Sequence, residues 1–418
     1  MRALIVLFLC FVLTGATAQD SAFVRQMIDS LCSPRYHGRG YVKNGDVKAA
    51  NFIVRQLKEM GVNEVEMHPF ELGVNTFPGR ADISISGKQL TPGVDYLIAP
   101  ESRACDGSYK VVQLKSKWAK SPESLFKQVN KGRFNNAFVA IDLTKASPGE
   151  LELLGSLRNN PLKAEGYILV VKDKLTWRVG RSVWNTTVIE LRHDAAPKNM
   201  SEIEVALDQE FLDSYRGVNV VATLGSHEGA TKPKILFTAH LDHLGRMGMN
   251  TMMPGANDNA SGSAMLLDLV KFYQHRAANY EMVFVWFGGE EAGLVGSTQF
   301  VENPPFELDD ILMVINLDLM GDAKGGITVV NGKIFSEEFA RLSSLNAEMG
   351  LLPRIKARGE AANSDHHPFY EKGVKSIFIY TMGDYKHYHD VLDRPENLPL
   401  TNYNQLFELI TAFVESGL

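Results

Sequence analysis

Two histidines and five carboxylates in the second half of the chain stand where short apolar runs end or turns begin. These side chains are His240, Asp242, Asp258, Glu290, Glu291, Asp318 and His389. A single histidine or acid at such a position is usually a solvated group or a helix cap. Several of them at the end of one apolar sheet need a counter-charge, because burying unpaired charges is costly. A divalent metal supplies that charge.

The donor atoms indicate which metal would bind. A set of two histidines and three carboxylates, without a thiolate, suits zinc, with Mn²⁺ or Co²⁺ as substitutes. One catalytic zinc takes three protein ligands and a water, so five ligands are too many for a single ion. They suffice for two ions if one carboxylate bridges them, and two-metal sites are a known solution for hydrolysis. The residue types therefore favour a hydrolytic site with two zinc ions.

The elements that would position these groups begin at Gly217, where the sequence takes on an α/β pattern. Short β-branched or aromatic runs, typical of buried strands, alternate there with helical periodicity. The expected strands are 218–224, 235–239, 282–287, 311–317 and 376–380, and the expected helices are 262–275, 336–349 and 402–415. This alternation predicts a mixed, mostly parallel sheet flanked by helices. Ligands of such sheets bind at the carboxyl ends of the strands, where the polar candidates stand.

The remaining sequence predicts a leader and two further parts. Residues 1–18 have the basic start, apolar run and small residues of a secretory signal peptide, so we expect export to the periplasm or the medium. Residues 19–73 would complete the α/β domain whose catalytic part is 214–418. Residues 74–213 show short strands between turns and predict a β-rich inserted domain. That insert would be either structural or a lid or wall that selects substrates.

Composition excludes several classes of partner. With 43 basic and 49 acidic residues the formal net charge is −6, and no basic stripe indicates a nucleic-acid partner. No stretch of the mature chain is long and apolar enough to predict a membrane span. Cys32 and Cys105 would remain after cleavage, and they would either pair in an oxidising compartment or stay as two buried thiols.

Five ordered segments resemble the motifs of the M28 family of zinc metallopeptidases, the di-zinc aminopeptidase group. The segments are His240-x-Asp242, Pro254–Gly262, Gly289–Ser297, Asn316–Asp318 and Tyr388-His389. The resemblance covers about residues 236–393. It implies the zinc-exopeptidase fold, also described as phosphorylase/hydrolase-like, and a peptide substrate with a free N-terminus. The β-rich segment stands where related enzymes carry a protease-associated-type insert.

The same resemblance implies a role for each candidate ligand. Asp258 would bridge the two metals. His240 and Asp318 would complete one zinc site, and Glu291 and His389 the other.

The resemblance also implies roles for two carboxylates that do not bind metal. Glu290 would be the general base and acid, and Asp242 would orient His240 from behind. A cis peptide is expected after the bridging aspartate, at Asp258-Asn259. Ser364-Asp365-His366 matches a further family element whose role the sequence leaves open.

Three departures from the family pattern lie beside the ligands. Asn257 stands where many relatives have Asp, Asp390 where Thr is common, and Asp393-Arg394 where Asp-Thr is usual. They leave the ligand set intact but bear on the substrate pocket. The alternatives are a single-zinc glutaminyl cyclase of the same fold, a carboxypeptidase or dipeptidase on the same site, and an inactive binding module. The residue preference and the oligomeric state stay open.

Overall fold

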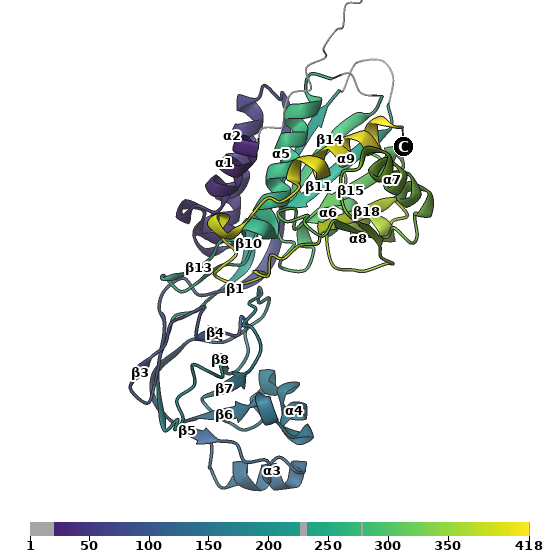
Figure 1. The fold of residues 1–418 in the computed structure, drawn as a ribbon. Helices are drawn as coiled ribbons and strands as arrows, with labels where there is room; N and C mark the ends of the chain where they lie inside the picture. Colours follow the sequence, from purple (N-terminus) through teal and green to yellow (C-terminus); the bar gives the residue numbers. More distant parts are fainter. Residues whose placement is uncertain (1–20, 226–231, 277–278, 418) are drawn as a thin grey trace, which may run out of the picture.

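The structure is a computed structural model that describes residues 21–225, 232–276 and 279–417 (Figure 1). The predicted signal peptide, residues 1–18, lies outside the described residues. Among the helices in these ranges, none combines the length and the apolar character needed to cross a bilayer. Figure 1 shows two lobes: the first lobe, residues 21–76 and 210–417, lies above the second lobe, residues 77–209.

The first lobe is built on a mixed sheet, which has eight strands within the described residues. β11 pairs in parallel with both β14 and β15, and β15 pairs in parallel with β18. The antiparallel strands β1 and β10 form one edge. In sheet order the strands are β1 (Glu64–Thr76), β10 (Glu210–Leu224), β14 (Glu281–Phe287), β11 (Lys234–His240), β15 (Ile311–Leu317), β18 (Ser376–Thr381), β16 (Ile327–Val330) and β17 (Ile355–Ala357).

Helices bury both faces of this sheet, because successive side chains of a strand point to opposite sides. Phe237 and Phe284 belong to one core cluster with helices α1, α2, α5 and α9. Leu236 and Val283 belong to another with helices α6 and α8. The helices are α1 (Ser21–Leu31), α2 (Gly45–Glu59), α5 (Gly262–Tyr273), α6 (Val295–Glu302), α7 (Ser336–Met349), α8 (His366–Glu371) and α9 (Tyr403–Glu415). The predicted α/β class, with a mixed sheet between helices, is confirmed.

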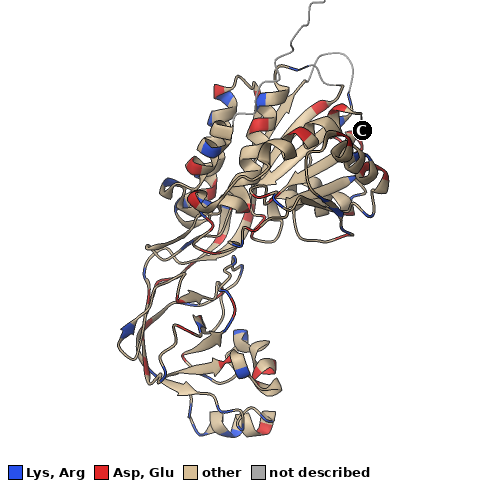
Figure 2. Ribbon diagram, viewed as in Figure 1, with Lys and Arg blue, Asp and Glu red and all other residues tan. Residues whose placement is uncertain are grey.

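The second lobe has its own sheet, also of eight strands among the described residues. Strands β5 to β8 run parallel to one another, and two helices cross between them as in an α/β unit. The strands are β3 (Lys88–Gln89), β2 (Ala81–Ile85), β9 (Glu202–Leu207), β5 (Cys105–Gln113), β6 (Ala137–Asp142), β7 (Gly166–Val171), β8 (Thr187–Arg192) and β4 (Tyr96–Ile98), and the helices are α3 (Pro122–Asn130) and α4 (Pro148–Leu154). Figure 2 shows acidic and basic residues interspersed over both lobes.

Cys32 and Cys105 do not form the disulfide that the sequence left open. Both are free and buried. Cys32 packs in the core of the first lobe and Cys105 in the core of the second. Burial in separate cores keeps the two thiols apart, so the second alternative, two buried thiols, is the observed one.

The two lobes are joined by adjacent strands and by a shared apolar contact. β1 leads into the second lobe at Thr76 and β10 leaves it at Glu210, and these two residues are register partners. The hairpin of β12 (Gly245–Met247) and β13 (Thr251–Met253) lies beside this junction. Its residues Met247 and Met253 belong to the hydrophobic core of the second lobe. The loop after β11 therefore lies directly against the second lobe.

Candidate active site

The structure brings all seven predicted side chains together at the carboxyl ends of the central strands. Strands β11, β14 and β15 end at the same rim, as parallel neighbours do. The turn before α5 and the loop after β18 complete it. β11 leads to His240 and Asp242, β14 to Glu290 and Glu291, and β15 to Asp318. The turn before α5 carries Asp258, and the loop after β18 carries His389.

The Asp258 carboxylate lies between two groups of ligand atoms. Its Oδ1 is 3.3 Å from His240 Nε2, which is itself 3.4 Å from Asp318 Oδ1. Its Oδ2 is 3.0 Å from His389 Nε2, which is 3.2 Å from Glu291 Oε2. Zinc bonds of about 2.0–2.2 Å in tetrahedral geometry place ligand atoms roughly 3.4 Å apart. Each of the two groups therefore has the spacing of ligands around one ion.

Two buried polar atoms support the same interpretation. Among the described residues, His240 Nε2 and Asp318 Oδ1 are buried without a hydrogen-bond partner. Such orphaned atoms are rare in proteins unless an ion, a water or a function accounts for them. Both belong to a group of His240, Asp258 and Asp318 ligand atoms that lie within 4.8 Å of one another. The donor set and its unsatisfied atoms fit zinc.

The turn that presents Asp258 is fixed by several local contacts. A cis peptide joins Asp258 to Asn259, as the resemblance implies. The Asp393 carboxylate accepts the backbone N–H groups of Asn257 and Asp258, at 2.8 and 3.0 Å. Gly255 has φ +63°, and an added Cβ would lie 2.2 Å from the Asp258 carbonyl oxygen. Asp393, which precedes the departure at Arg394, thus has a structural role at this turn.

The buried side chain of Arg39 ties this turn to the end of β11. Its guanidinium is 1% exposed. It donates to the backbone carbonyls of Leu241 at 2.9 Å and of Pro254 and Gly255 at 2.7 Å. Arg39 therefore holds the segments that carry His240 and Asp258 in one arrangement.

The Asp242 carboxylate does not hydrogen-bond to His240 as predicted. His240 Nδ1 lies 3.2 Å from the backbone carbonyl of Asp242, but 3.8 Å from its carboxylate. The carboxylate instead accepts the backbone N–H groups of Glu290 at 3.2 Å and Glu291 at 3.4 Å. The predicted carboxylate–histidine contact is thus replaced by a carbonyl–histidine contact. The carbonyl leaves Nε2 of His240 as the free ligand atom, since Nδ1 is then the protonated nitrogen.

The charges of the cluster shift the pKa values of its carboxylates in opposite directions. Burial raises the pKa of Glu290 well above its usual range; His240 opposes this and Glu291 adds to it. Burial alone would also raise the pKa of Asp258, but His240 and His389 hold it well below its usual range. Two carboxylates driven apart in this way are typical of one acid–base group and one permanent anion.

A buried carboxylate that sequence reasoning left open, Asp365, lies next to this cluster. It is fully buried, and neither of its oxygens has a hydrogen-bond partner among the described residues. Burial raises its pKa to about 7, and its charge contributes to the raised pKa of Glu290. Asp365 therefore adds to the negative field around Glu290.

His243 belongs to the site and was missed in the sequence. Its side chain is fully buried and its Nδ1 lies 2.8 Å from Glu291 Oε1. It forms a further group of potential ligand atoms with Asp258 and Glu291. The signal was present as a second histidine three positions after His240, in the segment His240-Leu241-Asp242-His243. The contact indicates that His243 fixes the Glu291 carboxylate.

Replacing His243 tests this contact. In His243→Leu, Glu291 loses its partner, and we expect about tenfold weaker zinc binding, the lower end for a partner of a metal ligand. In His243→Asn an amide N–H remains near the position of Nδ1, so we expect most of the affinity to be retained. Chelator competition on both variants measures the difference. Equal affinities for Leu and Asn would show that the contact with Glu291 does not matter.

A buried network leads from the site to the start of α2. Tyr41 donates to the Asp242 carboxylate at 3.4 Å, and its ring packs edge-on against Tyr215, with centroids 5.1 Å apart. Tyr215 in turn donates to the Asp46 carboxylate. Asp46 is 1% exposed, and burial raises its pKa to about 7.

Replacing Asp46 by Asn should stabilise the protein more at pH 8 than at pH 5. The folded-state pKa lies above the ordinary aspartate value of 3.8, so the folded chain binds the extra proton and the stability from this group falls as pH rises from about 4 to about 7. Asn cannot ionise and keeps the acceptor for Tyr215. The upper limit of the gain is about 4 kcal/mol. Thermal unfolding at both pH values measures it, with exposed Asp213→Asn as the control. An equal shift at both pH values would contradict the expectation.

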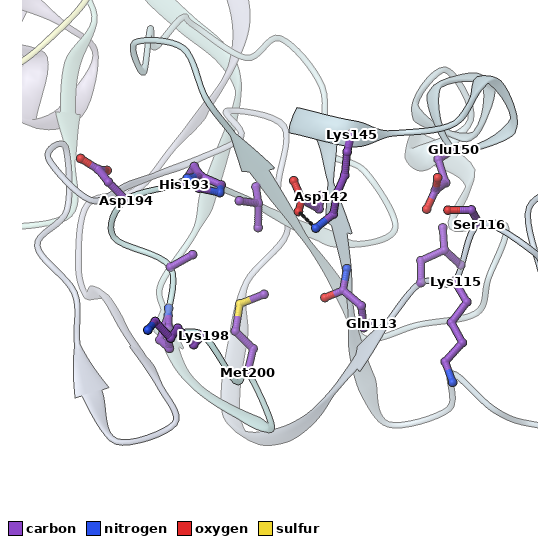
Figure 3. A pocket seen from close by; sticks show the side chains of 14 residues that line it. Gln113, Lys115, Ser116, Asp142, Lys145, Glu150, His193, Asp194, Lys198 and Met200 are labelled. Atoms are coloured by element: carbon purple, nitrogen blue, oxygen red, sulfur yellow. Dashed lines mark ion pairs between the residues drawn. The ribbon is translucent and has the colours of Figure 1, made fainter.

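A large cavity of the second lobe lies apart from the cluster. It has a volume of about 710 Å³ and lies at the carboxyl ends of β5 to β8 (Figure 3). Asp142 at its wall pairs with Lys145 at 2.9 Å, and Glu150 accepts the N–H and the hydroxyl of Ser147, at 2.8 and 2.6 Å. The Asp142 and Glu150 carboxylates thus stabilise the turn and the helix start on which they lie. No predicted site residue lines this cavity.

Comparisons with known proteins agree with this geometry. Residues 219–414, which include all seven predicted residues and His243, match the model of peptidase family M28. Aminopeptidase YwaD of Bacillus subtilis is 29% identical over 201 residues, 44% of this chain and 43% of the relative. A probable leucine aminopeptidase of Trichophyton verrucosum is 29% identical over 190 residues, 43% of this chain and 49% of the relative. The matched stretches thus span about half the length of these curated relatives.

Solved structures match nearly the whole chain and support the fold. The zinc aminopeptidase BSAP of Bacillus subtilis superposes with a TM-score of 0.71 at 18% identity, covering 94% of each chain. The aminopeptidase of Aneurinibacillus sp. strain AM-1 gives a TM-score of 0.64 at 20% identity, covering 96% of this chain and 94% of that one. The fold and the ligand cluster thus agree with the match of residues 219–414 to the model of peptidase family M28.

Proposed function

We propose that this protein is an exported aminopeptidase that uses two zinc ions to remove N-terminal residues from peptides. The observation that carries the proposal is the position of Asp258, whose two oxygens each face a separate pair of a histidine and a carboxylate. One carboxylate between two such pairs is the arrangement that a bridged two-metal site requires. The aminopeptidase names of the relatives point to the same chemistry.

The residues divide between the two ions as follows. His240 and Asp318 would hold one zinc, Glu291 and His389 the other, and Asp258 both. When bound, zinc polarises the substrate carbonyl and lowers the pKa of water. His243 and the backbone carbonyl of Asp242 would keep two of these ligands in place.

Glu290 would move the proton. Its carboxylate would accept a proton from the attacking water and deliver it to the nitrogen of the departing amine. Burial and the charge of Glu291 raise its pKa, which suits a group that must hold a proton between these two steps. Asp242 would orient Glu290 by accepting its backbone N–H.

The charge around the site favours a substrate with a free amine. Several carboxylates, among them half-buried Glu290 and buried Asp318 and Asp365, surround the cluster, and their ionised forms would attract a cationic α-amine. A carboxypeptidase would instead need a cation to bind the α-carboxylate. Arg39 already donates to backbone carbonyls, and Arg181 donates to the carbonyl of Ala292 at 3.3 Å. These two arginines are thus engaged in hydrogen bonds to the backbone.

Zinc content and substrate choice together test the proposal. Elemental analysis of the purified chain should give about two zinc ions per molecule. Aminoacyl chromogenic substrates should be cleaved, and their N-acetylated counterparts should not. Two zinc ions with cleavage of only blocked or C-terminal substrates would keep the chemistry and overturn the aminopeptidase assignment.

The same measurements separate the alternative of a single-zinc acyltransferase. One zinc per chain with cyclisation of N-terminal glutamine would put a glutaminyl cyclase first. A chain that takes up no zinc would overturn the ligand assignments. Export is tested by expressing the full chain and sequencing the N-terminus of the secreted form, which should begin after Ala18; a retained, uncut N-terminus would contradict it.

A further inference from the structure

The second lobe reaches the proposed metal site through one loop. This loop, residues 172–186, joins β7 to β8 and is called here the β7–β8 loop. It contacts residues 382–393, which follow β18 and carry His389, and which are called here the His389 loop. The two loops lie far apart in sequence: Trp177 and His389, which contact each other, are separated by 212 positions.

One backbone hydrogen bond and one side-chain hydrogen bond join Trp177 and His389. The Trp177 N–H donates to the His389 carbonyl at 3.0 Å. His389 Nδ1 lies 2.9 Å from the Trp177 carbonyl. A carbonyl only accepts, so Nδ1 donates in this contact, and Nε2 is the ring nitrogen that faces Asp258 and Glu291. The second lobe therefore holds the His389 ring with Nε2 turned toward the other proposed ligands.

Lys174 binds the same loop at three points. Its ammonium donates to the carbonyls of Lys386 at 2.9 Å and Tyr388 at 3.0 Å. It also pairs with Asp390 Oδ2 at 2.5 Å. Asp390 is one of the departures from the family pattern, and its side chain is only 9% exposed. The buried charge at that position is thus compensated from the other lobe.

Asp390 has two further contacts within its own loop. Its Oδ1 accepts the backbone N–H of Leu392 at 2.8 Å, and its Oδ2 lies 3.6 Å from His387 Nδ1. The Asp390 carboxylate thus binds the Lys174 ammonium of the second lobe and also stabilises the turn after His389.

The β7–β8 loop is itself fixed in the second lobe. The Trp177 side chain is 5% exposed and its indole N–H donates to the Ile98 carbonyl at 2.8 Å. Arg178 pairs with the Glu101 carboxylate, with Nη2 and Oε2 at 2.9 Å. A ligand is held accurately when its supporting groups are themselves locked by packing and hydrogen bonds.

The backbone of His389 needs such support. Its φ is +53°, in the left-handed region that residues with a side chain rarely adopt. Such conformations persist where surrounding contacts over-determine them. Trp177 contacts His389 itself, and Lys174 contacts the residues before and after it, Tyr388 and Asp390.

We propose that the second lobe is a working part of the metal site, in which Lys174 and the backbone of Trp177 position His389 as a zinc ligand. Lys174 is a positioning residue, because it acts through the loop that carries His389. The inference rests on the proposed two-zinc function. The second lobe would then support a metal ligand, a role that differs from both alternatives considered for the insert, a structural element and a wall that selects substrates.

Zinc affinity of the full chain tests the proposal. In Lys174→Met, competition with a chromogenic chelator should show one of the two zinc ions bound about tenfold more weakly and the other unchanged. Lys174→Arg keeps a cation that can donate to the carbonyls and to Asp390, and it should restore most of the affinity. Lys172→Met, an exposed lysine two positions away, is the matched control and should leave both ions as in the wild type.

A second readout does not depend on activity. In the metal-free protein, amide hydrogen exchange of residues 386–390 should be faster in Lys174→Met than in the wild type, while the strands of both sheets are unchanged. Asp390→Asn should mimic this effect, and the double variant should be no worse than the stronger single variant, because both remove one interaction.

The outcomes distinguish this proposal from the proposed function. A wild type without zinc would overturn both. A wild type with two zinc ions, together with a Lys174→Met variant that binds both within twofold and exchanges residues 386–390 as before, would overturn only the role of the second lobe. Loss of both ions in Lys174→Met would also contradict it, since only the site of His389 should weaken.

Discussion

Replacing Glu290 by Gln is expected to lower kcat/KM by about 10²–10⁴-fold, the contribution of a general acid–base group. Gln keeps the size and the hydrogen-bonding capacity of the side chain but cannot take up the proton of the attacking water. Burial raises the pKa of Glu290, whereas the histidines lower that of the bridging Asp258, so of these two carboxylates Glu290 is the one suited to exchange protons. Steady-state kinetics on an aminoacyl substrate measure the loss.

Zinc content must be measured on the same preparation. Glu290 also lies within ligand distance of His240 and Glu291, so a lost ion would be an alternative cause of inactivity. We expect the Gln variant to keep about two zinc ions per chain. Exposed Glu307→Gln serves as the matched control. Near-full turnover of Glu290→Gln, or loss of zinc from it, would overturn the assignment of Glu290 as the base.

Replacing Asp258 by Asn is the second change with a large expected effect. An amide offers one oxygen as a ligand, and its NH₂ group cannot coordinate a cation. One of the two His–carboxylate pairs therefore loses its shared ligand, and the site loses a negative charge. We expect zinc to fall from about two ions to about one per chain and kcat/KM to fall by at least about 10³-fold. Elemental analysis and steady-state kinetics measure both changes.

The control for Asp258→Asn is Asp309→Asn, which makes the same exchange at an exposed position. Added zinc separates weakened binding from misfolding, because a folded variant should recover part of its activity as the concentration of zinc rises. Two tightly bound ions and more than a tenth of the wild-type activity in Asp258→Asn would rule out a bridging role for Asp258.

The central strands and helices could be predicted from the sequence because their apolar patterns are local and continuous. The expected strand 311–317 coincides with β15, and 376–380 differs from β18 by one residue. The helix 336–349 coincides with α7. These strands are buried on both faces, so nearly every residue is apolar, and a run of that kind has few other interpretations.

Elements stabilised by partners distant in sequence could not be predicted. The short strands β16 and β17 lie at an edge of the first sheet and pair with strands or loops far along the chain. The parallel core of the second lobe was expected only as short strands, because the register between β5, β6, β7 and β8 leaves no local pattern. Its helix α3 begins at Pro122, a first-turn proline that follows the capping residue Ser121.

The candidate site was predictable as a set of residue types but not as a set of contacts. Strand ends identify His240, Glu291 and Asp318, since parallel strands deliver their termini to one rim. The contacts of Lys174 with the His389 loop have no such signature, because a lysine on one loop and a carbonyl on another are unremarkable until the fold brings them together. The boundaries 74 and 213 proposed for the insert stay predictions.

The pairing of Thr76 with Glu210 has a consequence for the order of folding. The antiparallel β1–β10 ladder continues beyond this pair to Glu64 and Thr223, so it closes a very long loop that contains the whole second lobe. Closing a flexible loop of that length costs chain entropy before any hydrogen bond of the ladder compensates for it. If the second lobe forms first, its two ends already lie side by side and the ladder can extend from Thr76 like a hairpin. Pulse-labelled hydrogen exchange should therefore protect β5 to β8 before β1, and the reverse order would show that the first lobe assembles around an unfolded loop.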